Sequence, residues 1–513
     1  MLLLFIYLCM IKNPPLSPNS TAPTVPPSLD AALMPVRRRG PPPPSFRPST
    51  GDQADLIRGW PEADLPPGHL ARQVMDFVEK LDVTALRASR SNLGRKGYDP
   101  MRLLAAWIYA SLDGVHQASQ LARRSVDDVA LRWLLGGYRP SQRCFGKFRA
   151  DSGAFLAAAL AQSAQMAAEQ GLIDPKALAV DSVRLRANVA GSSIRTVARS
   201  TERLEELDAI DVSALDARAR ATHERKRIKH EKALTTLAAL GRTNYSLTDP
   251  EASLMKFPSG AALPGYRLQV GASRSDLRFV VSAFIDGAPT DFGKLEEVVE
   301  SVLKGLENAG IDVVAAHPQL AADAGYTSEA DLRFASEHRS RVDLLVNAAD
   351  APAAYTDASK SKRKFSRADF QIRPDGRATC PAGTEMKGPS DHPDGTRTWR
   401  GVGCADCPLK ARCTTGKERT LSENTRTRLL RDEMIARLDE PGGRQRYSQR
   451  IATIEPVFSY IEHVMHFTRV SSRRPETVRA EVFLKLLAYN FKRLNSPVAG
   501  RPPGFAAYLR PRT

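Results

Sequence analysis

Apolar positions in residues 53–175 recur at the three- and four-residue spacing of amphipathic helices. The clearest stripe lies between Pro100, which suits the first turn of a helix, and Gly114, which ends it. The residues of this stripe are Leu103, Leu104, Trp107, Ile108 and Leu112. The pattern therefore predicts an α-helical domain over 53–175.

Further helices are expected in the same region over about 116–124 and 127–135, with Asp127 as the N-cap of the second. After a Gly-rich turn, Ser141 can cap a helix that runs to Arg149, and an Ala-rich helix fits 153–169. Short helices with Gly-containing turns and many basic residues suit a helix-turn-helix-like DNA reader. A helical bundle with a solvated basic face is the alternative. The basic residues are Arg123, Arg124, Arg139, Arg143, Lys147 and Arg149.

The pattern changes at Ala177 to short apolar runs typical of strands. Strands are expected over 177–185, 266–272, 279–285 and 342–346, and one more within 313–322. Amphipathic helices are expected over 292–308 and 328–338. A charged, Ala-rich segment over about 200–240 interrupts this order and predicts long exposed helices, either solvated or in contact with DNA. The fold class is therefore mixed α/β.

Three acids occupy chemically informative places. Asp181 and Asp323 each end an apolar run, and Glu455 lies in the segment Tyr447–Phe458, which is expected to open an amphipathic helix. Hard cations such as Mg²⁺ prefer oxygen ligands and leave positions open for phosphate oxygens. A pair of such ions can stabilise the attacking and leaving oxygens of phosphoryl transfer.

With these residues the chain resembles the DDE transposases of bacterial insertion sequences. The family has one Asp on its first strand, another after its fourth strand and a Glu on a late helix, and Asp181, Asp323 and Glu455 match them. Its late signature also includes a Tyr and an Arg, matched by Tyr447 and Arg450. The resemblance runs from about residue 98 to about residue 495 and implies an RNase H-like catalytic core.

Two positions depart from the family pattern. Glu462 stands where a Lys is expected seven positions after the Glu, and Arg184 follows Asp181 where the family usually has small polar residues and then a Lys. On a regular helix Glu455 and Glu462 would share one face. Glu462 near a DNA phosphate would weaken binding, because like charges repel.

The resemblance implies metal-dependent transposition. Asp181, Asp323 and Glu455 would hold Mg²⁺ or Mn²⁺, while Tyr447 and Arg450 would hold the DNA end. The partners would be double-stranded DNA at the element ends and the target, with a homodimer joining two ends. Two alternatives stay open: an inactive remnant acting as a DNA-binding repressor, and a metal-dependent nuclease.

The net charge of +17 agrees with a polyanionic partner. Residues 442–513 contain 13 Lys or Arg and four acids, so part of this charge lies beside Glu455. From the motif and the charge pattern together, Arg184, Arg143 and Lys147 are candidate DNA-binding residues beside Tyr447 and Arg450.

Four of the six cysteines cluster within 34 residues, with the spacing C-x23-C-x2-C-x5-C. Four thiolates are a typical ligand set for structural zinc, and a C-x2-C turn presents two of them together. A Cys-rich loop without metal is the alternative. In the subgroup that the chain resembles, an insertion with such cysteines lies between the second Asp and the Glu. The cysteines are Cys380, Cys404, Cys407 and Cys413.

The N-terminal segment is apolar over residues 1–11 and then Pro-rich, which predicts a disordered leader over 1–52 and favours a mis-assigned translation start. The apolar run is too short for a membrane helix. A cytoplasmic, nucleoid-associated protein is expected. The expected divisions are 53–175 DNA-binding, 176–348 first part of the core, 349–440 Cys-rich insertion, 441–495 Glu helix and closing helix, and 496–513 basic tail.

Overall fold

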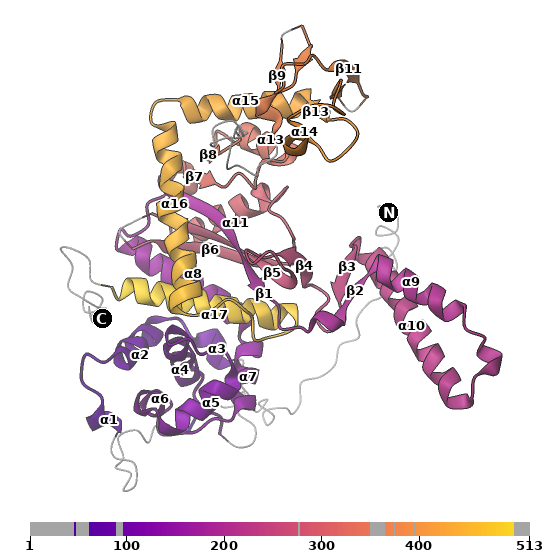
Figure 1. Ribbon diagram of the computed structural model, residues 1–513. Coiled ribbons are helices and arrows are strands. Elements are labelled where there is room, and N and C mark those ends of the chain that lie inside the picture. The colour runs from indigo at the N-terminus through magenta and orange to yellow at the C-terminus, as the bar shows by residue number, and fades with distance from the viewer. Residues whose placement is uncertain are drawn as a thin grey trace, which may run out of the picture. The chain divides into compact units, whose positions relative to one another are not determined.

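The computed structural model describes residues 46–47, 61–88, 96–274, 277–348, 365–373, 375–393 and 395–496 (Figure 1). The chain divides into a unit over 1–43 and a unit from Pro44 onward, and everything below concerns the second unit. Almost all of the expected leader and of the basic tail lies outside the described residues, so their expected disorder is not addressed. Among the described residues, no helix combines the length and the apolar character needed to cross a membrane.

The N-terminal part of this unit is helical, as the sequence predicts. Asp99 caps the helix that starts at Pro100, and Ser141 accepts a hydrogen bond from the backbone N–H of Cys144, which confirms it as an N-cap. Asp127 is not a cap, because the cap position is one residue later and Asp128 fills it. The helices are α1 Pro61–Asp64, α2 Leu70–Lys80, α3 Thr84–Ala88, α4 Pro100–Leu112, α5 Ala118–Asp127, α6 Val129–Leu134, α7 Gln142–Asp151 and α8 Gly153–Glu169.

A six-stranded mixed sheet follows, with the order β4-β5-β1-β7-β8 and β6 paired to β5. The central strand β1 is antiparallel to β5 and parallel to β7, and β7 is parallel to β8. This mixed α/β arrangement confirms the expected fold class and is consistent with an RNase H-like core. The strands are β1 Leu178–Arg186, β4 Ser253–Lys256, β5 Ala262–Ser273, β6 Phe279–Asp286, β7 Gln319–Ala322 and β8 Asp343–Val346.

The segment before Asp323 contains the expected strand, preceded by a short helix that the sequence did not predict. Its apolar run begins with a short helix, α12 Val313–Ala316, and only Gln319–Ala322 forms the strand. Asp312 accepts hydrogen bonds from the N–H groups of Val314 and Ala315, which favours the helix, and His317 has a positive φ of 43° before Pro318. Helices α11 Leu295–Asn308 and α13 Glu329–Glu337 complete this region.

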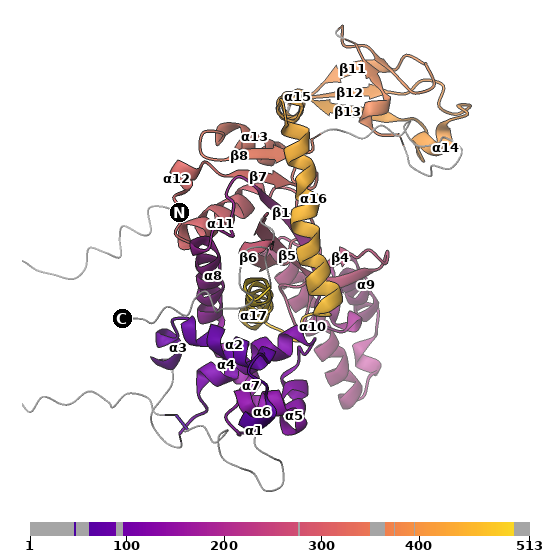
Figure 2. The same cartoon turned by 90° about the vertical axis from the view of Figure 1, so that its left-hand side faces the viewer.

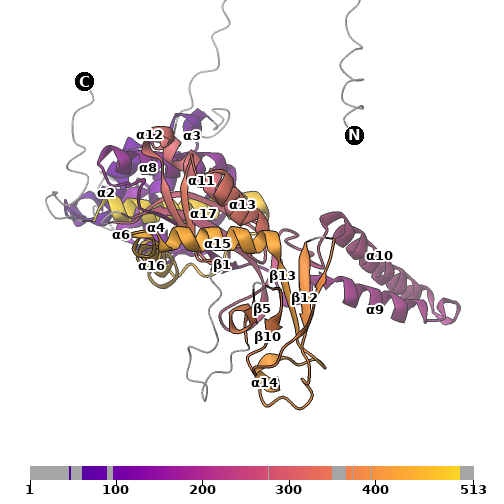
Figure 3. The same cartoon turned by 90° about the horizontal axis from the view of Figure 1, so that it is seen from above.

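The charged segment forms two long helices, α9 Val197–Asp208 and α10 Ala217–Leu240, as the sequence predicts. Helix α9 follows the short strand β2 Ile194–Thr196, and α10 precedes the short strand β3 Asn244–Ser246. The two strands pair with each other. Buried His223 of α10 bonds through Nε2 to the carbonyl of Leu207 in α9 at 2.9 Å. The two helices therefore lie side by side as a hairpin (Figure 3), and a small core of Ala233, Leu237 and Tyr245 joins α10 to β3.

The Cys-rich segment has its own small core around Trp399, which is fully buried. Its three-stranded sheet consists of β11 Lys387–Asp391, β12 Thr396–Arg400 and β13 Thr420–Asn424 (Figure 2). A two-stranded ladder of β9 Gln371–Ile372 and β10 Ala378–Thr379 and a short helix, α14 Lys410–Cys413, complete it. Helix α15 Thr425–Asp439 then leads back to the core, where it packs on α13.

Two C-terminal helices close the fold. Helix α16 Gly443–Ser459 lies against β1, β5, β7 and β8, and it continues into a π-helical turn, η5 Tyr460–Val464. Helix α17 Pro475–Leu494 packs on α8, α4 and α7 and on strand β6. It thereby joins the helical region to the sheet.

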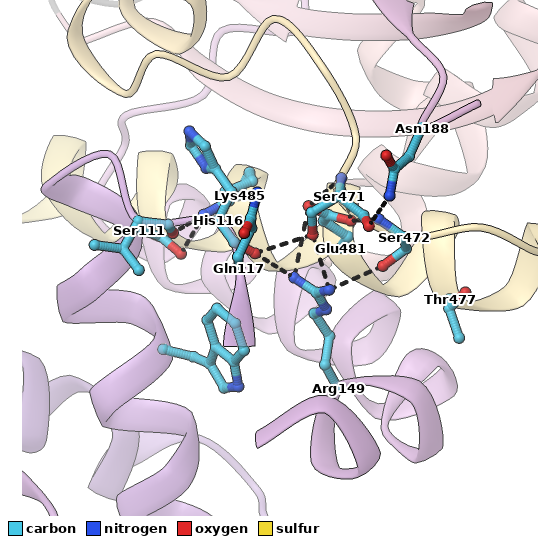
Figure 4. A network of polar contacts seen from close by, with 12 residues as sticks. Ser111, His116, Gln117, Arg149, Asn188, Ser471, Ser472, Thr477, Glu481 and Lys485 are labelled. Carbon is cyan, nitrogen blue, oxygen red and sulfur yellow. Dashed lines mark hydrogen bonds and ion pairs between the residues drawn. The ribbon is translucent and has the colours of Figure 1, made fainter. Parts of the chain in front are cut away.

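Three fully buried polar residues of α17 make this joint specific. Glu481 accepts hydrogen bonds from the N–H groups of Ser471 and Ser472, and Lys485 donates to Ser111 Oγ at 2.9 Å and to the Val115 carbonyl at 2.7 Å (Figure 4). Asn490 binds the β6 backbone. Buried polar groups need such partners, because an unpaired one loses its hydration without compensation.

Arg149 belongs to the same network. The sequence placed it among the basic residues of a DNA-facing surface, and the structure corrects this expectation. The Arg149 side chain is 8% exposed, forms an ion pair with Glu481 at 3.5 Å and donates to the hydroxyls of Ser471 and Ser472. A guanidinium buried in this way connects α7 to the C-terminal segment. It contributes to the fold and offers no exposed cationic surface to DNA.

Candidate active site

The strand register brings Asp181 and Asp323 together. Val180 of β1 pairs with Ala322 of β7 in a parallel ladder, and each acid is the next residue of its chain. Neighbouring strands lie about 4.8 Å apart. Two acids 142 positions apart in the sequence therefore stand side by side where the ladder ends.

Arg450 of α16 lies between the two acids. Its Nη1 is 2.6 Å from Asp181 Oδ2, and its Nη2 is 3.1 Å from Asp323 Oδ1. The Arg450 side chain is 10% exposed, while that of Asp323 is 45% exposed. One guanidinium thus spans two carboxylates from different strands, with one side of the acid pair still open to solvent.

Burial and neighbouring charges both shift the pKa values of the groups around Arg450. Burial raises the pKa of Asp181, with Asp323 adding to the rise and Arg450 opposing it. Burial likewise raises the pKa of Tyr447, one turn before Arg450, and the two acids raise it further. Tyr447, Arg450, Asp181 and Asp323 therefore form one electrostatic cluster.

A second polar network links the segments that follow the two acids. Buried Arg267 on β5 donates to Asp291 Oδ2 at 2.6 Å and to the hydroxyl of Ser182 at 2.7 Å, and Ser182 follows Asp181. Gln269 donates to the other Asp291 oxygen at 2.8 Å and accepts a hydrogen bond from Tyr326. The network therefore connects the segment after Asp181 to the turn after Asp323.

The sequence patterns did not single out Asp291, Arg267 or Gln269 as site residues. Their signal was weak, because an isolated acid after a strand is common. Gly325 offers a second clue: an added Cβ there would lie 3.3 Å from Asp291 Cβ. The turn after Asp323 is therefore packed directly against Asp291.

Comparison with protein families adds independent evidence. The chain matches a family described as "Transposase DDE domain" over residues 379–495 and one described as "Transposase domain (DUF772)" over residues 61–151. These two matches support a DDE transposase of insertion sequences. The first match includes Glu455 but neither Asp181 nor Asp323, so the sheet geometry supplies independent information about those two. No curated protein and no solved structure matches the chain.

The structure does not bring the transposase residue Glu455 to the two aspartates. It is exposed and lies five positions after Arg450, near the end of α16, the helix that contains the segment Tyr447–Phe458. In the part of the chain that is described, no group of three or more His, Cys, Asp or Glu residues is arranged to hold a metal ion. Convergence of the three acids therefore stays a prediction.

The expectation that Glu455 and Glu462 share a helix face needs correction. Glu462 lies in the π-helical turn η5, where wider i→i+5 bonding replaces the regular helix, and Pro456 lies within α16 before it. Side chains beyond this turn are rotated out of the 3.6-residue phase. A seven-residue spacing across it does not place two side chains on one stripe.

The remaining candidate DNA-binding residues occupy separate places. Arg143 is exposed in the first turn of α7, and Lys147, also exposed, forms an ion pair with Asp151 at 3.0 Å. Arg184 lies on β1 directly opposite Arg267 of β5. The structure brings neither Arg143 nor Lys147 to the acid pair.

The four clustered cysteines do meet. Cys380, Cys404, Cys407 and Cys413 line one cavity of about 290 Å³, and each is a half-buried free thiol. Burial raises the pKa of Cys413, and the other three thiols add to the rise. The four sulfurs are neighbours without yet having the arrangement of a metal-ligand set, so a bound ion would have to draw them in to about 2.3 Å.

Proposed function

We propose that this transposase cleaves DNA at the ends of its own element and joins them to target DNA in a metal-dependent reaction. The observation that carries the proposal is the Arg450 guanidinium held between Asp181 and Asp323. A cation already occupies the space between two carboxylates whose other side is open. The donor set, all carboxylate oxygens, fits Mg²⁺ or Mn²⁺.

Asp181 and Asp323 would hold the metal, with Glu455 completing a second site. When bound, the ions would stabilise charge on the attacking and leaving oxygens of phosphoryl transfer. The chain itself positions the acids through the parallel ladder and through the Asp291 network. Tyr447 and Arg450 would hold the DNA end beside them, since a guanidinium forms strong charge-assisted bonds to phosphate.

The other parts of the chain have roles in the same proposal. Arg143, Lys147 and Arg184 would contact the DNA backbone, and a homodimer would hold two ends of the element. Zinc bound by the four cysteines would stabilise the Cys-rich segment. The expected divisions at 53–175, 176–348, 349–440 and 441–495 are proposed as functional domains, and the protein would act on the nucleoid in the cytoplasm.

The test uses a labelled duplex that carries the flanking end of the element. We expect strand cleavage with Mg²⁺ or Mn²⁺, none with EDTA, and loss of cleavage in Asp181→Asn and Asp323→Asn with end binding retained. Arg444→Gln, an exposed change on the same helix, is the matched control. Cleavage that persists in Asp323→Asn would refute the proposal.

A further inference from the structure

A small cavity lies beside the acid pair, between α16 and the starts of β1 and β7. Its volume is about 30 Å³. A water molecule needs about 10–15 Å³ by this measure, so the cavity holds about two atoms of the size of a water oxygen. Leu178 and Leu320, which pair across the β1–β7 ladder, form part of its wall.

The polar lining of this cavity is cationic. Four basic side chains line it, together with the neutral polar residues Gln449 and Thr453, and no Asp or Glu does. The four are Lys176, Arg274, Arg446 and Arg450. They come from the segment before β1, the end of β5 and two successive turns of α16. The positive charges of these four side chains repel one another, and a bound anion would reduce this repulsion.

The hydrogen bonds of these four cations leave donors free. Lys176 donates to the carbonyl of His317 at 2.9 Å, and both Nη atoms of Arg450 face the two aspartates. Arg274 and Arg446 have no ion pair to any described acid, and their side chains are half-buried. Among the four, the ion pairs to Asp181 and Asp323 are made by Arg450.

Two guanidinium nitrogens at the cavity are buried and unpartnered. They are Nε of Arg446 and Nε of Arg450, and Arg450 as a whole is 9% exposed. A buried donor without a partner costs about 1–3 kcal/mol. Such groups call for an explanation, of which a bound ion or water is one.

We propose that this cavity binds a phosphate group. Arg446 and Arg274 would supply the charge not committed elsewhere, and Lys176, Gln449 and Thr453 would add donors. Arginine side chains suit tetrahedral oxyanions because their donors form paired bonds to two oxygens. This inference rests on the proposed function for its main source of phosphate, the DNA backbone.

The position fits that source. Leu178 precedes Asp181 by three residues on one strand, which is about 10 Å at the strand rise. Phosphates of one DNA strand are spaced about 3.4 Å along the helix axis. The pocket would therefore bind a phosphate a few nucleotides from the one being cleaved, and so fix the strand along α16.

The experiment compares the full chain with Arg446→Gln, Arg274→Gln and the control Arg444→Gln. Arg444 is on the same helix, but it is 69% exposed, paired with Asp439 and outside the cavity lining. Binding of inorganic phosphate is measured by calorimetry, and binding of a duplex end is measured across a salt series. Thermal melting of each variant checks that it is folded, and Arg446→Lys keeps the charge if Arg446→Gln does not fold.

We expect each pocket variant to weaken phosphate binding about tenfold and to lower the salt slope of duplex binding by about 1. Arg444→Gln should change neither. Loss of phosphate binding with an unchanged duplex slope would keep the oxyanion site and assign it to free phosphate. Pocket variants that behave like Arg444→Gln in both arms would overturn the site. Mn²⁺-dependent cleavage, assayed alongside, reports separately on the proposed function.

Discussion

At the residue scale, the Arg450 guanidinium and a divalent metal ion would compete for the space between the carboxylates of Asp181 and Asp323. Arg450 neutralises Asp181 and Asp323 at once and does so from a largely buried position. A divalent ion that bridges the same oxygens has to displace this guanidinium. The competition has a direct consequence for metal affinity.

Replacing Arg450 with Gln should raise the affinity of the DNA-free protein for Mn²⁺ several-fold, because the competing cation is gone. Electron paramagnetic resonance of free Mn²⁺ measures this affinity without any activity assay. Arg444→Gln removes an equal charge from the same helix and should leave the affinity unchanged. An affinity that falls in Arg450→Gln would mean that Arg450 supports the metal site and does not compete for it.

The network behind the acids makes a prediction about stability. Asp291→Asn leaves Arg267, whose side chain is 2% exposed, without its ionic partner. Removing one partner of a buried ion pair lowers the free energy of unfolding by about 3–5 kcal/mol. Because Asp291 is partly exposed, we expect a loss of about 3 kcal/mol. Urea unfolding measures it. A loss as small as that of Asp375→Asn, a change at an exposed acid paired with Arg377, would show that the pair does not stabilise the fold.

At the element scale, α17 depends on charges buried in its centre. Burial lowers the pKa of Lys485 to about 7 from an ordinary value of 10.5. Between these pH values the unfolded chain binds one proton more than the folded protein. Stability should therefore fall as the pH drops from about 10.5 to about 7, and the loss should be complete near the folded pKa.

Lys485→Met removes this dependence. The difference in unfolding free energy between variant and parent should shift in favour of the variant as the pH falls from 10 to 7. Denaturant unfolding at several pH values measures the difference, and Lys492→Met, near the end of the same helix, controls for loss of charge. A difference that is constant over this range would mean that Lys485 keeps its proton in the folded protein.

The elements also show how far sequence patterns reach. The spacing and runs of apolar residues predicted α4, α8, β5, β6 and α13, because the buried positions of each are mostly apolar. They also placed the strand before Asp323 but missed the short helix α12, which an Asp cap favours. They failed at η5, because a π-helical turn has no signature in the spacing of apolar residues.

At the scale of the whole molecule, the sequence could name the two aspartates, but only the β1–β7 register explains why they meet. Arg149 is the opposite case. Its sequence neighbours are exposed cations, and its burial depends on Glu481, 332 positions away. Long-range pairing of this kind is invisible in local patterns, and the Asp291 network was missed for the same reason.

The Cys-rich segment gives a prediction about the folding of the molecule. Purified protein should contain one zinc ion per chain, and Cys407→Ser should lose it, because the four cysteine side chains line one cavity. Elemental analysis measures the metal, and Cys144→Ser, a change at a cysteine outside the cluster, should keep it. A metal-free protein that melts as cooperatively as the zinc-loaded one would exclude a stabilising role for zinc.

The central claim is that Asp181 and Asp323 form a metal site. Anomalous diffraction from crystals of the full chain soaked in Mn²⁺ tests it most directly, since Mn²⁺ scatters anomalously and Arg does not. The expected result is a peak between the two carboxylates, with the Arg450 guanidinium moved away from them. A structure without a peak there, in which Arg450 still spans both acids at saturating Mn²⁺, would contradict the account.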